Sequence, residues 1–279
     1  MATPTASTLS SRRRTVFSFE RYRLAHDEFV LLQDLTFTIH ENESIAIVGP
    51  TGSGKSVLLA VMQQSLWGLS ERERLRAARR WKESGGVSIL GHACAPDLPQ
   101  STALQQIHSE IAMVPESSAW LPVSVAENFA AVQRLAGHTT LKSYEEIVDE
   151  FAQSTRNRSL LISLAEQMPG QIEAPYLQYL ALIRAFVRKP KVILLDEALI
   201  RLDPILLRHA ESMLYEHTNK TTMVWATNDL HQASRMTDRT LLLFGGKLWE
   251  DSETTAFFSN PRTIEAEAFI SGREPELES

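Results

Sequence analysis

The chain has 279 residues, a formal net charge of −6 and a single cysteine, with 43% of its residues hydrophobic and 22% charged. This composition predicts a packed globular core in one large α/β domain, with room for one inserted subdomain. The acidic balance argues against general binding to nucleic acids or anionic membranes, the lone Cys94 excludes an intrachain disulfide, and no apolar run reaches the roughly 18 residues of a membrane-spanning helix.

The first predicted elements are strands that lead into a glycine-rich turn. Residues 1–14 hold three consecutive arginines in a Ser/Thr-rich stretch without an apolar run, so we expect a disordered tail rather than a signal peptide. Alternating apolar and polar residues predict strands within 15–48, and the apolar run 45–48 is typical of a strand buried on both faces. After the turn, an apolar helix is expected at about 55–67.

The rest of the chain combines one long helical stretch with short apolar strands. The charged segment 70–84 is expected to be helical, and the helical pattern of 117–188 is expected to form an inserted helical subdomain. The acidic end, 274–279, is expected to be loose. The remaining predicted elements are strands at 87–90, 110–114, 192–195 and 223–226, and a hairpin at 241–249 with a tight Gly245-Gly246 turn.

A phosphate-binding motif stands at the glycine-rich turn. The segment fits G-x-x-x-x-G-K-S/T at every fixed position and lies between a predicted strand and a predicted helix. Glycines allow N–H groups to surround an anion, the helix start adds its dipole, and a bare turn that binds nothing is the alternative. Lys55 would reach the β- and γ-phosphates, and the Ser56 hydroxyl would reach Mg²⁺. The predicted nucleotide-binding residues are Gly49, Pro50, Thr51, Gly52, Ser53, Gly54, Lys55 and Ser56.

An acidic pair follows the apolar strand predicted at 192–195. Asp196, at the end of this strand, can reach a Mg²⁺ on the nucleotide, and Glu197 is placed to act as the general base for an attacking water. The alternative is an acidic pair at a helix start, where the helix dipole favours negative charge. Because the phosphate motif lies upstream, we prefer the catalytic interpretation.

These residues and those that follow resemble the ATP-binding subunits of ABC transporters, over residues 15–273. Asp203-Pro204 follows the acidic pair at the spacing of that family's D-loop, and Thr227-Asn228-Asp229 follows the next apolar strand, at the place of its switch segment. The resemblance is closest to the ATPases of phosphate-import systems. The stretches that carry this closer resemblance are 111–114, 121–128, 232–235, 257–262 and 267–273.

The resemblance implies a P-loop NTPase fold of the ABC ATPase type, with a mostly parallel core sheet, an N-terminal antiparallel β region and an inserted helical subdomain. It also implies ATP and Mg²⁺ as cofactors, with Ser56 and Asp196 at the metal. Two ATPase chains, as a homodimer or a heterodimer, would enclose two ATP molecules and drive membrane-spanning permease subunits. The chain would then be cytoplasmic and peripheral on the inner face of the cell membrane.

The chain departs from the family at the signature motif. Counting back from Arg184, which matches an arginine after that motif, the slot for Leu-Ser-Gly-Gly-Gln holds Ile172-Glu173-Ala174-Pro175-Tyr176. Glu173 would direct a negative charge at the γ-phosphate, and Pro175 removes an N–H donor. We therefore interpret this segment as a helix start, with Pro175 near its first turn and no role toward a ligand.

Three further positions differ from the family. Glu116 takes the place of the Q-loop glutamine; it can still meet Mg²⁺ or water, but an ionised carboxylate cannot donate a hydrogen bond. Asn228 takes the place of the switch histidine. Unlike histidine, asparagine carries no positive charge and cannot transfer a proton. The aromatic residue that would stack on adenine is matched best by His26, with Tyr22 as the alternative.

The family residues that this chain keeps, together with those that it replaces, predict ATP binding with weak hydrolysis. The kept groups are Lys55, Ser56, Asp196 and Glu197, whereas groups that sense the γ-phosphate or reach across the dimer are changed. The first hypothesis is the ATPase subunit of an importer for phosphate or a similar anion. In that case, apolar residues 119–122 would contact a membrane subunit, unless they only pack internally. The alternative is a non-transport ABC protein that binds nucleotide and regulates a partner.

Overall fold

The centre of the fold is a six-stranded sheet, seen in the computed structural model, which describes residues 13–66, 80–94, 102–152 and 155–273. Its strand order is β10-β9-β3-β8-β7-β6, and only β10 runs antiparallel to its neighbour. Its strands are β3 (Ser44–Val48), β6 (Ile111–Val114), β7 (Val192–Asp196), β8 (Thr222–Ala226), β9 (Arg239–Phe244) and β10 (Lys247–Glu253). Every residue of β3 and β8 is buried, as expected for parallel strands covered on both faces.

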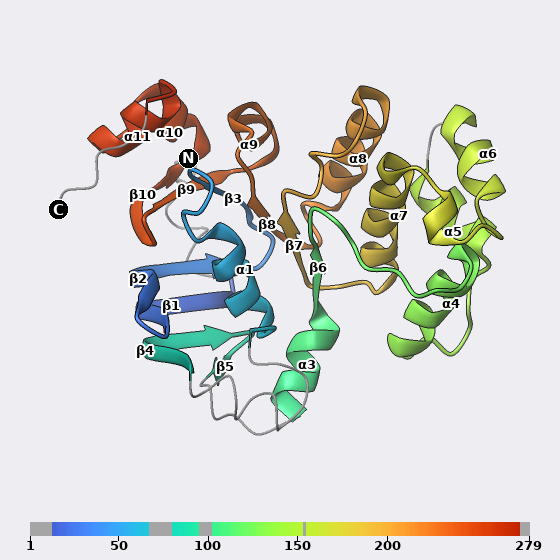
Figure 1. The fold of residues 1–279 in the computed structure, drawn as a ribbon, viewed down its shortest axis with the longest axis horizontal. Helices are drawn as coiled ribbons and strands as arrows, with labels where there is room; N and C mark the ends of the chain where they lie inside the picture. The colour runs from blue at the N-terminus through green and yellow to red at the C-terminus, as the bar shows by residue number, and fades with distance from the viewer. Residues whose placement is uncertain (1–12, 67–79, 95–101, 153–154, 274–279) are drawn as a thin grey trace, which may run out of the picture.

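A second, antiparallel sheet of four strands has the order β2-β1-β4-β5. It consists of β1 (Thr15–His26), β2 (Phe29–His40), β4 (Trp81–Ile89) and β5 (His92–Cys94). Its apolar face shares one core with the central sheet, and Phe19 stacks on Phe37 there at 4.7 Å between ring centroids. Figure 1 shows helix α1 between the two sheets.

The segment 81–84 was expected to be helical, and that prediction is wrong. These residues belong to β4, which pairs with β1 from Trp81, opposite His26, to Ile89, opposite Phe17. Pairing along a whole neighbouring strand outweighs the local preference of a few charged residues for helix. The part of this predicted helix at 70–79 lies outside the described residues, as do residue 67 of the predicted helix 55–67 and 1–12 and 274–279 of the predicted tails.

The helices lie around the central sheet and at one end of it (Figure 1). They are α1 (Lys55–Gln63), α3 (Thr102–Glu110), α4 (Val125–Leu135), α5 (Tyr144–Phe151), α6 (Thr155–Ser163), the short 3-10 helix η3 (Pro169–Gln171), α7 (Ala174–Val187), α8 (Pro204–His217), α9 (Leu230–Met236), α10 (Thr254–Ser259) and α11 (Ile264–Ile270). Helix α1 ends earlier than predicted, because Gln64 takes a left-handed backbone conformation with φ 58°. No helix among the described residues is long and apolar enough to cross a bilayer.

Helices were expected across 117–188, and α4 to α7 lie there, at the end of the molecule away from the antiparallel sheet (Figure 1). Capping boxes start two of them: Ser124 with Glu127 at α4, and Ser143 with Glu146 at α5. Their apolar faces form one core with β6 to β8, in which Phe129 is fully buried. That these helices form an inserted subdomain stays a prediction.

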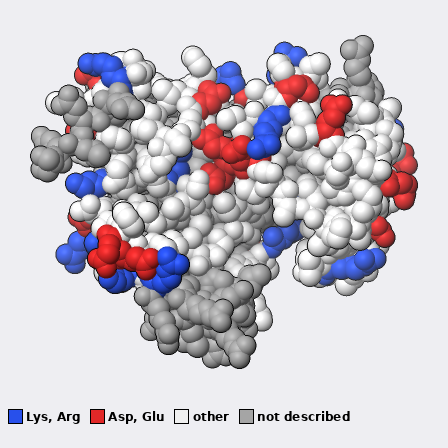
Figure 2. All heavy atoms as spheres, in the orientation of Figure 1, with Lys and Arg blue, Asp and Glu red and all other residues white. Residues whose placement is uncertain are grey.

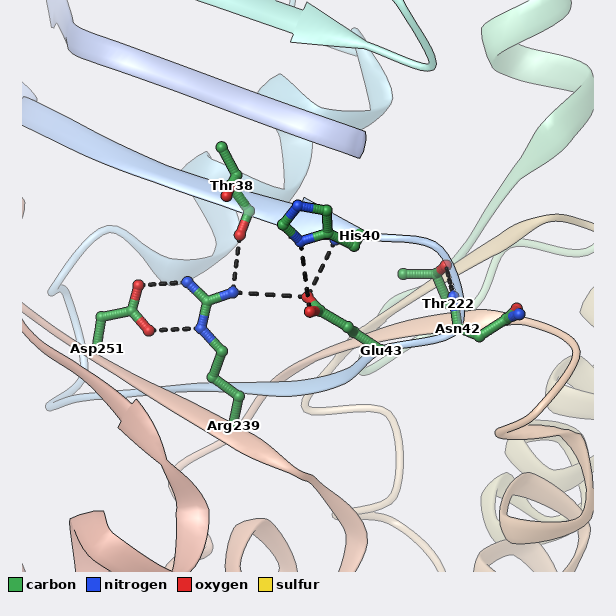
Figure 3. A network of polar contacts seen from close by, with 7 residues as sticks. All are labelled: Thr38, His40, Asn42, Glu43, Thr222, Arg239 and Asp251. Atoms are coloured by element: carbon green, nitrogen blue, oxygen red, sulfur yellow. Dashed lines mark hydrogen bonds and ion pairs between the residues drawn. The ribbon is translucent and has the colours of Figure 1, made fainter. Parts of the chain in front are cut away.

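A charged network joins the two sheets (Figure 3). Arg239 on β9 pairs with Asp251 on β10, donates to the carbonyl oxygen of Thr38 on β2 at 2.8 Å, and lies 3.5 Å from Glu43. His40 lies 3.4 Å from the same Glu43. Burial lowers the pKa of Arg239, but the two carboxylates outweigh it and the pKa is raised. The network fixes β2, which borders the phosphate loop, to the edge of the central sheet.

Candidate functional site

The predicted phosphate loop connects β3 to α1. Gly49 has a φ of 153°, and a Cβ there would lie 1.9 Å from the carbonyl oxygen of Leu243 on β9. Gly54 is the N-cap of α1, with a φ of 105°. Only glycine fits at both positions, because one allows no side-chain atom and the other needs a left-handed backbone. The loop is therefore packed against β9 and opens onto the N-terminus of α1.

Lys55 is buried in this loop, with 6% of its surface exposed. Its Nζ donates to the carbonyl oxygens of Gly49 at 2.6 Å and Pro50 at 3.0 Å, and to Oδ1 of Asn228 at 2.8 Å. Burial lowers the pKa of Lys55, and the nearby carboxylates of Glu197 and Asp196 oppose that shift. The structure thus brings together two predicted site residues that are far apart in the sequence.

The predicted metal-binding pair also meets. Oγ of Ser56, in the first turn of α1, donates to Oδ1 of Asp196 at the end of β7, at 2.9 Å. Burial raises the pKa of Asp196, while the hydrogen bond from Ser56 and the charge of Lys55 lower it. A hydroxyl and a carboxylate in contact beside a phosphate loop are the donor set that phosphate-bound Mg²⁺ uses in proteins.

Glu197 follows in a strained left-handed conformation, with a φ of 49°. Its N–H donates to the carbonyl oxygen of Ala226 at the end of β8, at 2.9 Å. Its Oε1 is buried and has no hydrogen-bond partner within the part of the chain that the structure describes. Burial raises the pKa of Glu197, and the charges of Asp196 and Glu116 add to that effect. A buried carboxylate oxygen without a partner is placed to receive a polar ligand atom or a water.

A cavity of about 350 Å³ lies against this carboxylate. Glu197 lines it together with Thr227, Asn228 and Asp229, which follow β8. Asp229 caps α9 by accepting from the N–H of Gln232 at 3.0 Å, so the switch segment is held at a helix start. The carboxyl ends of β7 and β8 thus form the walls of the site, as is usual for ligand sites in parallel sheets.

Glu116, predicted as a metal ligand, is held by a residue that the sequence analysis missed. Its carboxylate lies 2.9 Å from Nη2 of Arg201, in the segment between β7 and α8. The charge of Glu116 raises the pKa of both Asp196 and Glu197, so it belongs to the same electrostatic environment. Figure 2 shows acidic side chains gathered near the centre of this face, with basic side chains beside them.

Gln178 is a second residue that the sequence analysis missed. It is buried in α7, and its Nε2 donates to the carbonyl oxygens of Pro115 at 2.8 Å and Ala198 at 2.9 Å. It therefore ties the segment before Glu116 to the segment after Glu197. The sequence signal that could have identified Gln178 is a single amide side chain within an otherwise apolar helical pattern.

The altered signature segment starts α7, as predicted. Glu173 is the N-cap residue but makes no side-chain capping hydrogen bond, and Pro175 lies in the first turn. The side chain of Glu173 is exposed. The helix N-terminus thus presents a free carboxylate and lacks one N–H donor.

The alternative assignment of Tyr22 to adenine stacking is wrong, because its side chain is 0% exposed and lies in the core. His26 lies at the end of β1, opposite Phe29 on β2 and Trp81 on β4. Its ring centroid lies 4.5 Å from that of Trp81, and Phe29 is 74% exposed. The three residues are paired side by side across three strands. The sequence analysis missed Phe29 and Trp81 because their alignment depends on strand register.

Comparison with known proteins gives a family match and whole-length relatives. The model of the family described as "ABC transporter" matches residues 32–200. The phosphate import ATP-binding protein PstB of Bacillus anthracis is 26% identical over 264 residues, covering 94% of this chain and 92% of its own length. Phosphate import ATP-binding protein PstB 2 of Shouchella clausii is 28% identical over 267 residues, covering 95% and 93%.

Two solved structures share the fold. The ATP binding subunit of an ABC transporter aligns with a TM-score of 0.71 at 18% identity, over 92% of this chain and 99% of that one. A bacterial Atm1-family ABC exporter with ATP bound aligns with a TM-score of 0.73 at 19% identity, over 96% of this chain. This chain spans 43% of the exporter chain.

Proposed function

The chain belongs to the ABC transporter family as an ATP-binding subunit and an ATPase, and from that premise we propose that it serves an importer of phosphate or a similar anion. Support for the substrate comes from the two phosphate-import relatives, which match over more than nine-tenths of both chains. The hydrogen bond of 2.9 Å between Ser56 and Asp196 supports the nucleotide-dependent part of the proposal, because it joins the phosphate loop to the acidic end of β7.

The site residues have distinct proposed roles. Lys55, buried among carbonyl oxygens, would exchange those partners for the β- and γ-phosphates of ATP. Ser56 and Asp196 would hold Mg²⁺, which neutralises developing phosphate charge when bound. Glu197, with its partnerless Oε1, would orient and deprotonate the attacking water. His26 and the exposed Phe29 beside it would stack on adenine.

Hydrolysis is proposed to be weak. Asn228 offers the γ-phosphate a neutral amide, whose oxygen accepts from Lys55 at 2.8 Å. Glu116 adds negative charge near Asp196 and Glu197. Loss of one charge-stabilising donor typically costs about 100- to 1000-fold in rate in acyl transfer, and we expect a loss of comparable size here.

The proposed partners are a second ATPase chain and membrane-spanning permease subunits, which would place this chain on the inner face of the membrane. Within 119–122, Trp120 packs under the guanidinium of Arg184, at 4.0 Å, whereas Leu121 is 53% exposed. Ala119 and Pro122 are exposed as well, so three residues of this stretch are available for a permease helix, and Leu121 is the largest of them. A partner chain with an unaltered signature would complete the site over this P-loop.

Uptake of labelled phosphate by cells tests the substrate. Cells that lack this chain should lose uptake, the wild-type chain should restore it, and a Lys55→Ala variant should not. Unchanged uptake in all three strains would exclude phosphate import.

The alternative, a nucleotide-binding regulator outside transport, is favoured by the carboxylate at the start of α7. Purification of the tagged chain from solubilised membranes separates the two functions. A transport subunit should bring a polytopic membrane protein with it, and a Leu121→Glu substitution should reduce the recovery. A regulator should be recovered without one.

A further inference from the structure

A second cavity, of about 570 Å³, lies away from the candidate nucleotide site. It is enclosed by the segment between α4 and α5, by α5 itself, and by the residues that end α7 and α8. Its volume is in the usual range for sites of small organic ligands. Because α5 and α8 contribute to the same cavity, an occupant would touch both the helices of 117–188 and the helices beside the central sheet.

The cavity and the nucleotide site lie at opposite ends of β7. Pro190, just before β7, lines the cavity, whereas Asp196 at the end of β7 belongs to the nucleotide site. A strand rises about 3.3 Å per residue, so the five residues of β7 separate the two places by roughly 13 Å or more. The two cavities share no lining residue. A ligand in one therefore does not overlap a ligand in the other.

One wall of the cavity is aromatic. Phe151 on α5, Phe186 on α7 and His217 on α8 form a cluster, with the His217 ring centroid 4.5 Å from that of Phe186 and 5.9 Å from that of Phe151. Nδ1 of His217 bonds to the carbonyl oxygen of Met213 at 2.8 Å, and a carbonyl can only accept, so Nδ1 carries a proton and the ring is fixed in place. Flat rings held in this way suit a flat apolar or aromatic group.

The rim of the cavity is cationic. Lys142, Lys189 and Lys220 line it, against the single carboxylate of Glu150. Nζ of Lys142 lies 2.7 Å from Oε2 of Glu150, so these two charges form an ion pair. Lys189 and Lys220 are exposed, and neither ammonium group has an ion-pair or hydrogen-bond partner among the described residues. Two uncompensated positive charges therefore face a cavity with an aromatic wall.

We propose that this cavity is a binding site for a small organic anion, with a flat apolar or aromatic body and a phosphate or carboxylate group. The body packs on Phe186 and His217, and the anionic group pairs with Lys189 and Lys220. The hydroxyl group of Thr139, which also lines the cavity and is exposed, is available to donate to the anion. An occupant links α5 to α8 and so restrains the helices of 117–188 relative to the central sheet.

The probe for this site is 4-fluorophenyl phosphate, observed through its fluorine NMR signal. The titration uses the full chain carrying Lys55→Ala, so that binding at the phosphate loop is removed. Saturable binding is expected, and inorganic phosphate, which lacks the ring, should bind at least tenfold more weakly. Benzyl alcohol, which lacks the charge, should also bind at least tenfold more weakly.

The matched variants locate the site. Substituting both exposed lysines, Lys189→Gln and Lys220→Gln, should weaken the binding at least tenfold. The pair Lys82→Gln and Lys247→Gln removes the same charge from exposed positions on β4 and β10, and should change binding less than twofold. The proposal is overturned if no saturable binding occurs in the Lys55→Ala chain, if the two pairs have equal effects, or if inorganic phosphate binds as tightly as the probe.

Discussion

Lys55 and Glu197 are partly buried groups of opposite charge, and burial shifts their pKa values in opposite directions. It disfavours the charged form of each, so the pKa of the lysine falls and that of the glutamate rises. The ammonium of Lys55 uses its three donors on Gly49, Pro50 and Asn228, whereas Oε1 of Glu197 has no hydrogen-bond partner among the described residues. At the scale of single residues, this is the pattern of a site that is built to accept a ligand.

The raised pKa of Glu197 predicts the pH dependence of turnover. A general base must be ionised, so the rate should fall as the pH drops, through a value above the roughly 4.3 of an ordinary glutamate. The pKa of Asp196 is also raised, and its charge acts on Glu197, so the acid limb belongs to the coupled pair. Steady-state ATPase rates measured between pH 5 and 8 check this.

The control is Glu197→Gln, which keeps the size of the side chain but cannot accept a proton. It should lower turnover at least tenfold and change the acid limb, which then reports Asp196 alone, while ATP binding is kept. Equal rates for the variant and the wild type would remove Glu197 from the mechanism.

At the scale of elements, Gln178 connects two loops to α7. A Gln178→Leu substitution leaves the carbonyl oxygens of Pro115 and Ala198 buried without donors, which should destabilise the fold by about 2 kcal/mol. Urea unfolding measures this as a lower midpoint. The exposed Gln105→Leu is the matched control and should change stability by less than about 0.5 kcal/mol. Equal midpoints for the two variants would contradict the proposed role of Gln178.

Arg239 holds together the edge where the two sheets meet. Replacing it by leucine leaves Asp251 and Glu43, both mostly buried, without their shared cation. Removing one partner of a fully buried pair costs about 3–5 kcal/mol, and partial exposure here should reduce the cost to about 2 kcal/mol. The exposed pair of Arg80 and Asp27 is the control, and Arg80→Leu should lower the unfolding midpoint much less than the Arg239 substitution does in the same experiment.

The elements differ in how far their local sequence determines them. The strand, glycine turn and helix around Lys55 were predictable, because glycine chemistry and an apolar run act locally. The strand conformation of 81–84 was not, since pairing with β1 decides it. The same holds for the side-by-side pairing of His26, Phe29 and Trp81, which depends on strand register. Likewise, the contact between Glu116 and Arg201 depends on how two loops meet.

At the scale of the whole molecule, we infer that the start of α7 would limit ATP hydrolysis between two copies of this chain. A helix N-terminus binds anions through its free N–H groups, and here it carries Glu173 and Pro175. The double substitution Glu173→Ser and Pro175→Gly removes the negative charge and restores an N–H donor. It should raise steady-state ATP turnover by the chain alone about tenfold or more.

The same double substitution in the Lys55→Ala chain should give no turnover, which shows that the gain arises at the P-loop. If turnover does not rise in the chain with Lys55 intact, the signature segment is not what limits hydrolysis. In that case the lack of a partner chain, or Asn228 in place of the switch histidine, would limit hydrolysis.

The most direct test of the account is ATP binding and steady-state ATP turnover by the purified chain with Mg²⁺, beside Lys55→Ala and the exposed control Lys247→Ala. We predict saturable ATP binding that Lys55→Ala weakens at least tenfold and Lys247→Ala leaves unchanged, together with turnover that is slow in every chain. Absence of binding to the wild-type chain would contradict the assignment of the P-loop. Rapid turnover that depends on Lys55 would contradict the inference that Glu116, Glu173 and Asn228 weaken hydrolysis.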